Sequence, residues 1–264
     1  MTDTEVGSTA GSRRTARTSQ ASQASQAART AQTPRAGRTA LDTLAEDRGQ
    51  FTQENKAKWV AGVLRTRIME GLFQPNDRLP EKEITEALKV SRNTLREAFW
   101  LLTDERLLER EHSRGVFVRQ PSIQDVADIY RVRRIVECAA VRGIGKGRLD
   151  LDALEDAVVE GEDAAANQDW RGLGTANMHF HRGIAALAQS PRIDELMSRI
   201  LAELRLVFHI MESPRSFHEP YLARNAQILD TIRKREAAKA EHLLGEYLDD
   251  AKKQIIIAYG PRAL

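Results

Sequence analysis

The chain has 264 residues, with 40 lysine and arginine side chains against 38 aspartate and glutamate side chains, so its formal net charge is only +2. This length suffices for two modest domains or one large domain. Because the charges nearly balance, the net charge alone does not indicate a nucleic-acid partner. The single cysteine, Cys138, excludes an internal disulfide and a cysteine-based zinc cluster.

The sequence carries no signal for a membrane. No apolar run reaches the roughly 18–20 residues that span a bilayer, and the N-terminus lacks the apolar core of a signal peptide. We therefore expect no membrane partner and a cytoplasmic location, which a lone cysteine also fits because the cytoplasm is reducing.

Residues 1–50 are expected to form a disordered basic tail. Glutamine, alanine, serine, threonine and arginine dominate this stretch, and a Ser-Gln-Ala near-repeat occupies residues 19–27. Such a composition cannot bury enough apolar surface to offset the entropy lost on ordering. Its seven arginines could touch DNA phosphates nonspecifically, and a merely solvated tail is an equally good interpretation.

The next stretch predicts three helices in close succession. A first helix is expected over 57–72, because its apolar residues recur at spacings of three to five and share a broad face: Trp59, Val63, Ile68 and Leu72. A proline-containing turn follows, and shorter helices are expected over 81–88 and 92–105. Ser91 is the expected N-cap of the second of these.

Two short strands are expected next, over 107–111 and 116–119, joined by a loop that ends in glycine. Helix, turn, helix and hairpin in this order predict a winged helix-turn-helix domain over residues 51–121. In that plan the second helix of the pair enters the major groove, and the residues of its first turns meet base edges. Arginine reads guanine with two hydrogen bonds, and asparagine can read adenine in the same way.

The helix over 92–105 separates a polar face from an apolar face. Arg92, Asn93, Thr94 and Arg96 open the helix and are the candidates for reading bases or binding phosphates. Leu95, Ala98, Phe99 and Leu102 are expected to pack inward. Arg114 lies at the tip of the hairpin, from which it could reach the minor groove or the backbone.

From residue 122 to residue 264 the pattern is helical almost throughout, with glycine and proline between the segments. Short links between the helices indicate an antiparallel bundle. The fold class is therefore mainly α: an N-terminal winged helix-turn-helix followed by a C-terminal all-α helical bundle. The helices are expected near 123–145, 151–168, 170–188, 192–212, 218–235 and 236–258.

Residues 59–120 resemble the DNA-binding domain of the GntR family of bacterial regulators. The resemblance implies that Arg92 and Arg96 read bases, that Lys82 contacts DNA, and that the wing around Gly115 meets the backbone or a groove. Asn76 and Arg106 depart from the family, which usually has glycine at both places. The strings that carry the resemblance are 68–72 with Pro75, 79–81, 90–98 and 114–118. The expected DNA contacts are then Lys82, Ser91, Arg92, Asn93, Thr94, Arg96, Arg114 and Gly115.

The C-terminal half resembles the FCD-type sensor domain of the FadR subfamily, through strings at 133–137, 177–181, 225–232 and 240–248. In that family an aspartate and three histidines commonly hold a divalent metal. Asn177, His181, Asn225 and Tyr247 stand at those four positions here. Amides and a phenol are poor donors for zinc-like ions, so we expect no metal cofactor. A site completed by His179 or His242 is the alternative.

These residues predict a polar cavity rather than a metal centre. Arg133 can form a two-bond fork to a carboxylate or phosphate, and the resemblance implies an organic acid or a similar metabolite. The competing interpretation of His181 is an ordinary core histidine. The expected ligand-binding residues are Arg133, Asn177, His181, Asn225 and Tyr247, with no catalytic residue.

The sequence thus predicts a regulator that binds operator DNA as a homodimer and responds to a small effector. One alternative is a DNA-binding protein whose helical domain only dimerises and senses nothing. A more remote alternative is a helical-bundle metalloenzyme, against which stands the absence of a nucleophile elbow, a phosphate loop or a paired metal motif from the sequence.

Overall fold

The structure, a computed structural model, describes residues 48–145, 149–211 and 213–259, with side chains described from residue 56 onward. The chain divides into two compact units, 1–55 and 56–264. Most of the tail expected over residues 1–50 lies outside the described residues. Its last three residues, 48–50, belong to the first helix.

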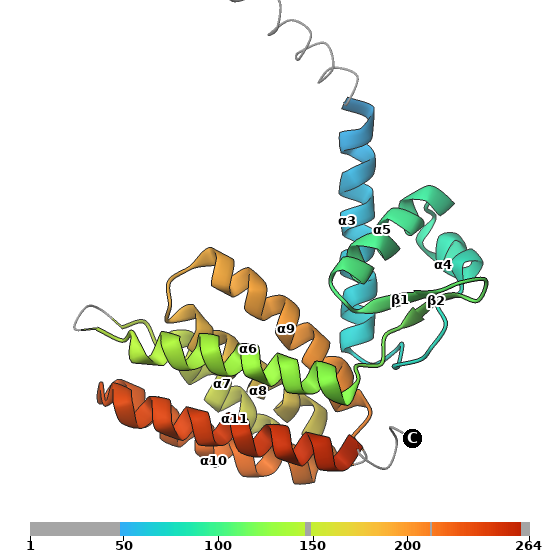
Figure 1. The fold of residues 1–264 in the computed structure, drawn as a ribbon. Helices are drawn as coiled ribbons and strands as arrows, with labels where there is room; N and C mark the ends of the chain where they lie inside the picture. The colour runs from blue at the N-terminus through green and yellow to red at the C-terminus, as the bar shows by residue number, and fades with distance from the viewer. Residues whose placement is uncertain (1–47, 146–148, 212, 260–264) are drawn as a thin grey trace, which may run out of the picture. The chain divides into compact units, whose positions relative to one another are not determined.

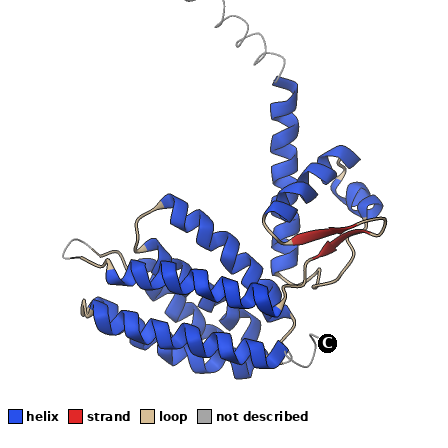
Figure 2. Ribbon diagram, viewed as in Figure 1, coloured by secondary structure: helices blue, strands red, loops and turns tan. Residues whose placement is uncertain are grey.

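The first described elements form the winged domain (Figures 1 and 2). Its two strands pair antiparallel, with Leu108 opposite Val118 and Glu111 opposite Gly115. An isolated bridge between Arg78 and Phe117 adds a third strand-like segment. The elements are α3 (Arg48–Met69), α4 (Glu81–Leu88), α5 (Arg92–Asp104), β1 (Leu108–Glu111) and β2 (Gly115–Val118).

The apolar face predicted for α3 is wrong at both of its ends and right at Ile68, which is fully buried. Trp59 and Leu72 are exposed, at 55% and 66% of their surface, and the helix ends at Met69, before Leu72. Val60 and Leu64 lie inward with Ile68, because their regular spacing of four follows the 3.6-residue helical period more closely.

Two left-handed residues shape the loops of the winged domain where the sequence departs from glycine. Asn76 has φ of 72° and Arg106 has φ of 56°. Asparagine tolerates this region because its short polar side chain can form local hydrogen bonds, whereas arginine has no such compensation. Arg106 is therefore a point of backbone strain just before β1.

We expect Arg106→Gly to raise the free energy of unfolding by about 0.5–1 kcal/mol. Glycine removes a left-handed cost of about 1–2 kcal/mol but adds about 0.5–1 kcal/mol of entropy to the unfolded chain. Urea unfolding of the purified variant measures the difference. Arg106→Ala is the control, because alanine keeps the Cβ and therefore the strain. Equal stability of the glycine and alanine variants would contradict the account.

The remaining helices form an all-α bundle, and the predicted mainly-α fold with a winged N-terminal part is confirmed. Helix α6 packs against α11, α8 and α9, while α7 and α10 pack against α8. Ser122 and Asp125 form a capping box at the start of α6. The helices are α6 (Ile123–Arg142), α7 (Asp152–Ala166), α8 (Trp170–Ala186), α9 (Pro191–His209), α10 (Pro214–Arg233) and α11 (Ala237–Tyr259).

The winged domain and the helical bundle each have their own apolar core. In the winged domain, Leu79, Leu95, Phe99 and Val118 are buried in one cluster. The larger cluster fills the bundle, where its members come from all six helices. Over the described ranges, no helix is both long and apolar enough to cross a membrane.

Candidate DNA-reading and ligand-binding sites

Helix α5 presents the polar face that the sequence predicts. Arg92, Asn93 and Arg96 are exposed, whereas Leu95 and Phe99 on the opposite side are at most 1% exposed. The Arg96 guanidinium lies 3.7 Å from the Glu81 carboxylate of α4, a loose and solvated ion pair. A duplex phosphate or base edge can therefore replace Glu81 as the partner of Arg96 at little cost.

Thr94 does not belong to this exposed face, which corrects the sequence prediction. Its side chain is only 4% exposed. The Ser91 Oγ accepts a hydrogen bond from the Thr94 backbone N–H at 3.1 Å, and the two hydroxyls lie 2.8 Å apart. Both hydroxyls are thus used to start α5, because the first N–H groups of a helix need such acceptors. Ser91 itself remains exposed.

The other expected DNA contacts lie on the surface of the winged domain. Lys82 is exposed near the start of α4. Arg114 pairs with Glu111 within the hairpin, and its guanidinium lies 5.4 Å from the centre of the Phe117 ring. Gly115 has φ of 116°, a conformation that favours glycine and lets the wing turn tightly.

The five residues predicted to bind a ligand meet in the interior of the bundle. All are buried, with Arg133 and His181 each only 1% exposed. The Asn177 Oδ1 accepts hydrogen bonds from Asn225 Nδ2 at 2.8 Å and from the Tyr247 hydroxyl at 2.7 Å. The rings of His181 and Tyr247 lie 4.9 Å apart, edge to face. Helices α6, α8, α10 and α11 each supply at least one of these side chains.

Glu137 is a further member of this cluster that the sequence analysis did not select. Its carboxylate, fully buried, accepts a hydrogen bond from Arg133 Nε at 2.8 Å and lies 2.6 Å from His181 Nδ1. Burial alone would raise the pKa of Glu137, but the charge of Arg133 and the hydrogen bonds from His181 and Arg133 outweigh it and hold this pKa below its usual value. The spacing of four residues between Arg133 and Glu137 was the signal that could have found it.

Three buried polar atoms of the cluster have no hydrogen-bond partner within the described part of the chain: Arg133 Nη2, His181 Nε2 and Asn225 Oδ1. Native proteins pair nearly all such atoms, so an orphan in the interior requires water or a bound molecule. These three belong to residues that already interact through Glu137 and Asn177. They therefore mark a place where a polar ligand can complete the core.

The two histidines considered as alternative ligands lie elsewhere. His179 is partly exposed and lies 2.6 Å from Glu160. His242 is mostly exposed and lies 3.5 Å from Glu246. His181 and His179 are two positions apart on α8, so they point to different sides, as the helical period predicts.

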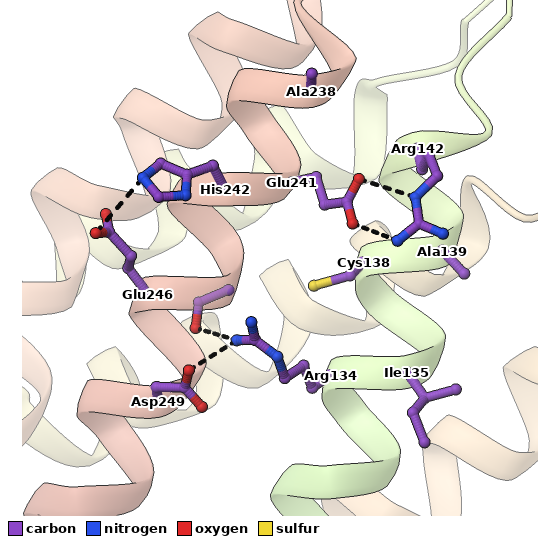
Figure 3. Close-up of a pocket in the computed structure, with 11 residues that line it drawn as sticks. Arg134, Ile135, Cys138, Ala139, Arg142, Ala238, Glu241, His242, Glu246 and Asp249 are labelled. Carbon is purple, nitrogen blue, oxygen red and sulfur yellow. Dashed lines mark hydrogen bonds and ion pairs between the residues drawn. The ribbon is translucent and has the colours of Figure 1, made fainter.

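A recess lies on the outer surface, where α6 meets α11 (Figure 3). It has a volume of about 730 Å³, and its lining includes Cys138 and Ala139. Arg134 reaches across it to Asp249 at 2.9 Å, and Arg142 pairs with Glu241. Arg133 points into the core and Arg134 outward, so this groove and the buried cluster are different sites on the same helix.

Two further histidines lie around the end of α9, the buried His218 and the partly buried His209. His218 stacks edge-on against Phe208 and Phe217, and burial, together with the charge of Arg205, lowers its pKa to about 3. His209 Nε2 donates to the backbone oxygens of Ile68 and Met69 at 3.1 Å, and burial lowers its pKa to about 4. The sequence analysis assigned no role to either histidine.

We expect stability to fall steeply as the pH drops below 6.5. The unfolded chain protonates His209 and His218 near pH 6.5, whereas the folded chain keeps both neutral down to about pH 4 and pH 3. Each histidine then lowers the free energy of unfolding by about 1.4 kcal/mol per pH unit from 6.5 down to its folded pKa. Urea unfolding at pH 7.5, 6.0 and 5.0 measures the slope. His218→Phe should make the slope shallower, and an unchanged slope would contradict the assignment.

Comparison with known proteins shows which family the chain belongs to. Residues 56–118 match the profile of the gntR family of bacterial regulatory proteins, and residues 128–250 match the FCD domain. A solved GntR transcriptional regulator from Rhodococcus sp. RHA1 is 46% identical, with a TM-score of 0.76, and the match covers 78% of this chain and 99% of that one. The chain belongs to the GntR family of bacterial regulatory proteins.

Relatives of known role agree with this membership. The galactonate operon transcriptional repressor of Escherichia coli K12 is 26% identical over 71% of this chain and 91% of its own length. The Uxu operon regulator of Haemophilus influenzae is 26% identical over 74% of this chain and 80% of its own length. Escherichia coli McbR/YncC, 19% identical with a TM-score of 0.65, shares the fold. This GntR regulator is therefore a DNA-binding transcriptional regulator with an FCD domain.

The residues of this GntR regulator do not fit the metal that its subfamily commonly holds. Asn177 Oδ1 already accepts two hydrogen bonds, and Asn225 and Tyr247 direct a donor, not a lone pair, toward it. Within the described ranges no three histidine, cysteine or acidic side chains gather as a metal-binding group. Beside His181 the negative charge of Glu137 is already paired with the positive charge of Arg133, so the cluster has no net negative charge to offer a metal cation.

Proposed function

We propose that this GntR regulator binds operator DNA as a homodimer and that a small metabolite, bound in the buried cluster, changes its operator affinity. The proposal of an effector site depends on one observation: Arg133, His181 and Asn225 each have a buried polar atom without a hydrogen-bond partner. A bundle that served only for dimerisation would gain nothing from a buried arginine, since replacing buried ion pairs by apolar side chains is often neutral or stabilising.

An organic acid is the effector class that the cluster fits best. The free Nη2 of Arg133 is a donor of the kind that binds carboxylate oxygens. The galactonate operon repressor, whose name refers to a sugar acid, matches 91% of its length to this chain. Both observations support an acidic metabolite without naming one.

Helix α9 supplies a physical connection between the two functions. Leu206 of α9 is fully buried within the core of the winged domain, while Leu204 and Val207 lie in the core of the bundle. Arg205 Nε donates to the backbone oxygen of Met69, the last residue of α3, at 3.1 Å. We propose that a shift of α9 on effector binding is passed to the winged domain through these contacts.

We further propose that the protein is not an enzyme. Glu137 is the buried carboxylate that would be the candidate general base, and both of its oxygens already interact, one with Arg133 and one with His181. A general base must be free to take a proton, and the lowered pKa of Glu137 makes it a poor one.

Two experiments on the full chain test the proposal. Sequencing the DNA fragments that the purified protein selects should yield a two-fold symmetric site, because a symmetric dimer presents two recognition helices. A thermal-shift screen with metabolites should then find a stabilising compound that changes affinity for that site. If no compound stabilises the protein, the dimerisation-only alternative is favoured; if no DNA sequence is enriched, operator binding is wrong.

A further inference from the structure

Trp100 is an exposed tryptophan on α5, the helix that presents Arg92 and Arg96. It is 72% exposed, whereas the neighbouring Phe99 is 1% exposed. Tryptophan has one of the largest apolar surfaces of any side chain, so this exposure leaves a large apolar area in water. Single exposed apolar residues are nevertheless common on folded proteins. The role of Trp100 must therefore be judged from its position on α5 as well as from its exposure.

Trp100 occupies the middle of the exposed face of α5. At about 100° per residue, it lies about 80° around the helix axis from Arg92, between Arg96 at about 40° and Asn93 at about 100°. The buried residues of α5 occupy the opposite side of the axis, from about 200° to about 340°. Trp100 therefore shares a face with the side chains that are expected to read bases.

The position of Trp100 along the helix differs from that of the two arginines. Helix α5 begins at Arg92, and with a rise of about 1.5 Å per residue Trp100 lies about 12 Å beyond Arg92 and about 6 Å beyond Arg96. The major groove is about 8.5 Å deep, and a recognition helix meets base edges with its N-terminal residues. When the first turns of α5 reach the bases, its third turn lies at the rim of the groove, where the sugar-phosphate backbone runs.

The indole of Trp100 suits a contact with this backbone. Its Nε1–H is a hydrogen-bond donor only, and a phosphate oxygen is an acceptor. Its ring is a large and rigid surface that can pack against a deoxyribose at a low cost in side-chain entropy. Among the side chains that the structure describes, that of Trp100 forms no hydrogen bond and no ring contact. A duplex can therefore engage it without breaking an existing contact.

The charges around Trp100 do not favour a phosphate by themselves. Glu97 and Asp104 lie three residues before it and four residues after it, on the adjacent turns. The last turn of α5 contains no basic residue. Salt dependence of DNA binding arises from cationic side chains that displace counterions from the phosphates. The affinity that Trp100 contributes should therefore hardly change with salt, unlike that from Arg92 and Arg96.

We propose that Trp100 is a further DNA contact of this GntR regulator: its indole Nε1–H donates to a phosphate oxygen at the rim of the major groove, and its ring packs against the adjoining sugar. Such a contact adds affinity without selecting a sequence. The inference rests on the proposed operator binding and goes beyond it, because Trp100 is not among the contacts that the resemblance to the GntR family implies.

Fluorescence anisotropy with the selected operator and with a random duplex tests the contact. Trp100→Ala should raise the dissociation constant for both duplexes by at least about 10-fold, as the loss of a hydrogen bond to a charged group predicts. The slope of affinity against salt concentration should stay the same. Trp100→Phe, which keeps a ring but removes the N–H, should lose part of the affinity.

Trp59→Ala is the matched control, because it removes an exposed indole from α3 of the same domain. It should change the dissociation constant by less than about 2-fold, as is usual for a surface substitution. Equal losses from Trp59→Ala and Trp100→Ala would contradict the assignment, since the effect would then not depend on the reading face of α5.

A spectroscopic measurement separates a direct contact from an indirect effect on folding. The chain has three tryptophans, so Trp59→Phe with Trp170→Phe leaves Trp100 as the only one. Acrylamide should quench its emission readily in the free protein and much less when operator is bound. Circular dichroism and size-exclusion chromatography of Trp100→Ala should match those of the parent.

Three further results would overturn the inference: unchanged DNA affinity of Trp100→Ala, a loss confined to the operator, or a Trp100 that stays open to acrylamide on bound DNA. A changed oligomeric state of Trp100→Ala would also overturn it, because the ring would then belong to a contact between protein chains. Failure of the proposed operator binding is recognised separately: the Arg92→Ala, Arg96→Ala variant would then keep the parent's affinity as well.

Discussion

The double variant Arg92→Ala, Arg96→Ala should lose operator binding almost completely. Each arginine that reads a base with two hydrogen bonds is worth about 1–3 kcal/mol, so removal of both should raise the dissociation constant by roughly 30-fold to 10⁴-fold. The fold should survive, because both side chains are exposed and the apolar face of α5 is unchanged. Fluorescence anisotropy with the selected operator fragment measures the loss, and circular dichroism checks the helix content.

A matched control separates base reading from bulk charge. Arg131→Ala with Arg192→Ala removes two exposed arginines from the helical domain and changes the net charge by the same amount. This control should keep its preference for operator over random DNA. If the Arg92 and Arg96 variant kept both affinity and sequence preference, α5 would not be the reading helix.

Glu137→Ala should destabilise the helical domain by about 3–5 kcal/mol. The substitution leaves the Arg133 guanidinium buried without a counter-charge and deprives His181 Nδ1 of its acceptor, and breaking a buried pair in this way is strongly destabilising. Urea unfolding followed by circular dichroism measures the change. Glu241→Ala, which removes the ion-pair partner of Arg142 at the surface between α6 and α11, should change stability little.

A neutral replacement distinguishes stability from sensing. Arg133→Met with Glu137→Gln removes both charges, and the amide oxygen can still accept a hydrogen bond from His181. This double variant should unfold at nearly the same urea concentration as the parent while losing its response to the effector. A double variant as unstable as Glu137→Ala would show that the charges themselves hold the bundle together, contrary to this account.

The sequence predicted helix starts well where they depend only on neighbouring residues. Ser91 caps α5 as expected, since an N-cap depends only on the residues that follow it. The helices of the bundle begin and end within a few residues of the predicted positions. The largest difference is in α10, which was expected from residue 218 but begins at Pro214 and contains Pro220 within it. Trp59 was misplaced because spacings of three to five fit more than one face of a helix, and Thr94 was misplaced because its hydroxyl serves the cap.

The buried cluster shows where sequence reasoning stopped. The resemblance to the FCD domain brought together Arg133, Asn177, His181, Asn225 and Tyr247, which do meet in the structure. It contained no reason to select Glu137, since family positions for metal ligands do not include an arginine's counter-charge. The orphan atoms arise from three-dimensional pairing between helices far apart in the sequence, so no spacing along the chain reveals them.

The most direct test of the account is the operator affinity measured with and without the effector found by the screen. The parent protein should show a change of about 5–150-fold, the usual range for coupling between two sites. The Arg133→Met, Glu137→Gln variant should bind operator with the parent's effector-free affinity and change less than about 2-fold when the effector is added. An equal effector response in both proteins would place the sensing site somewhere other than the buried cluster.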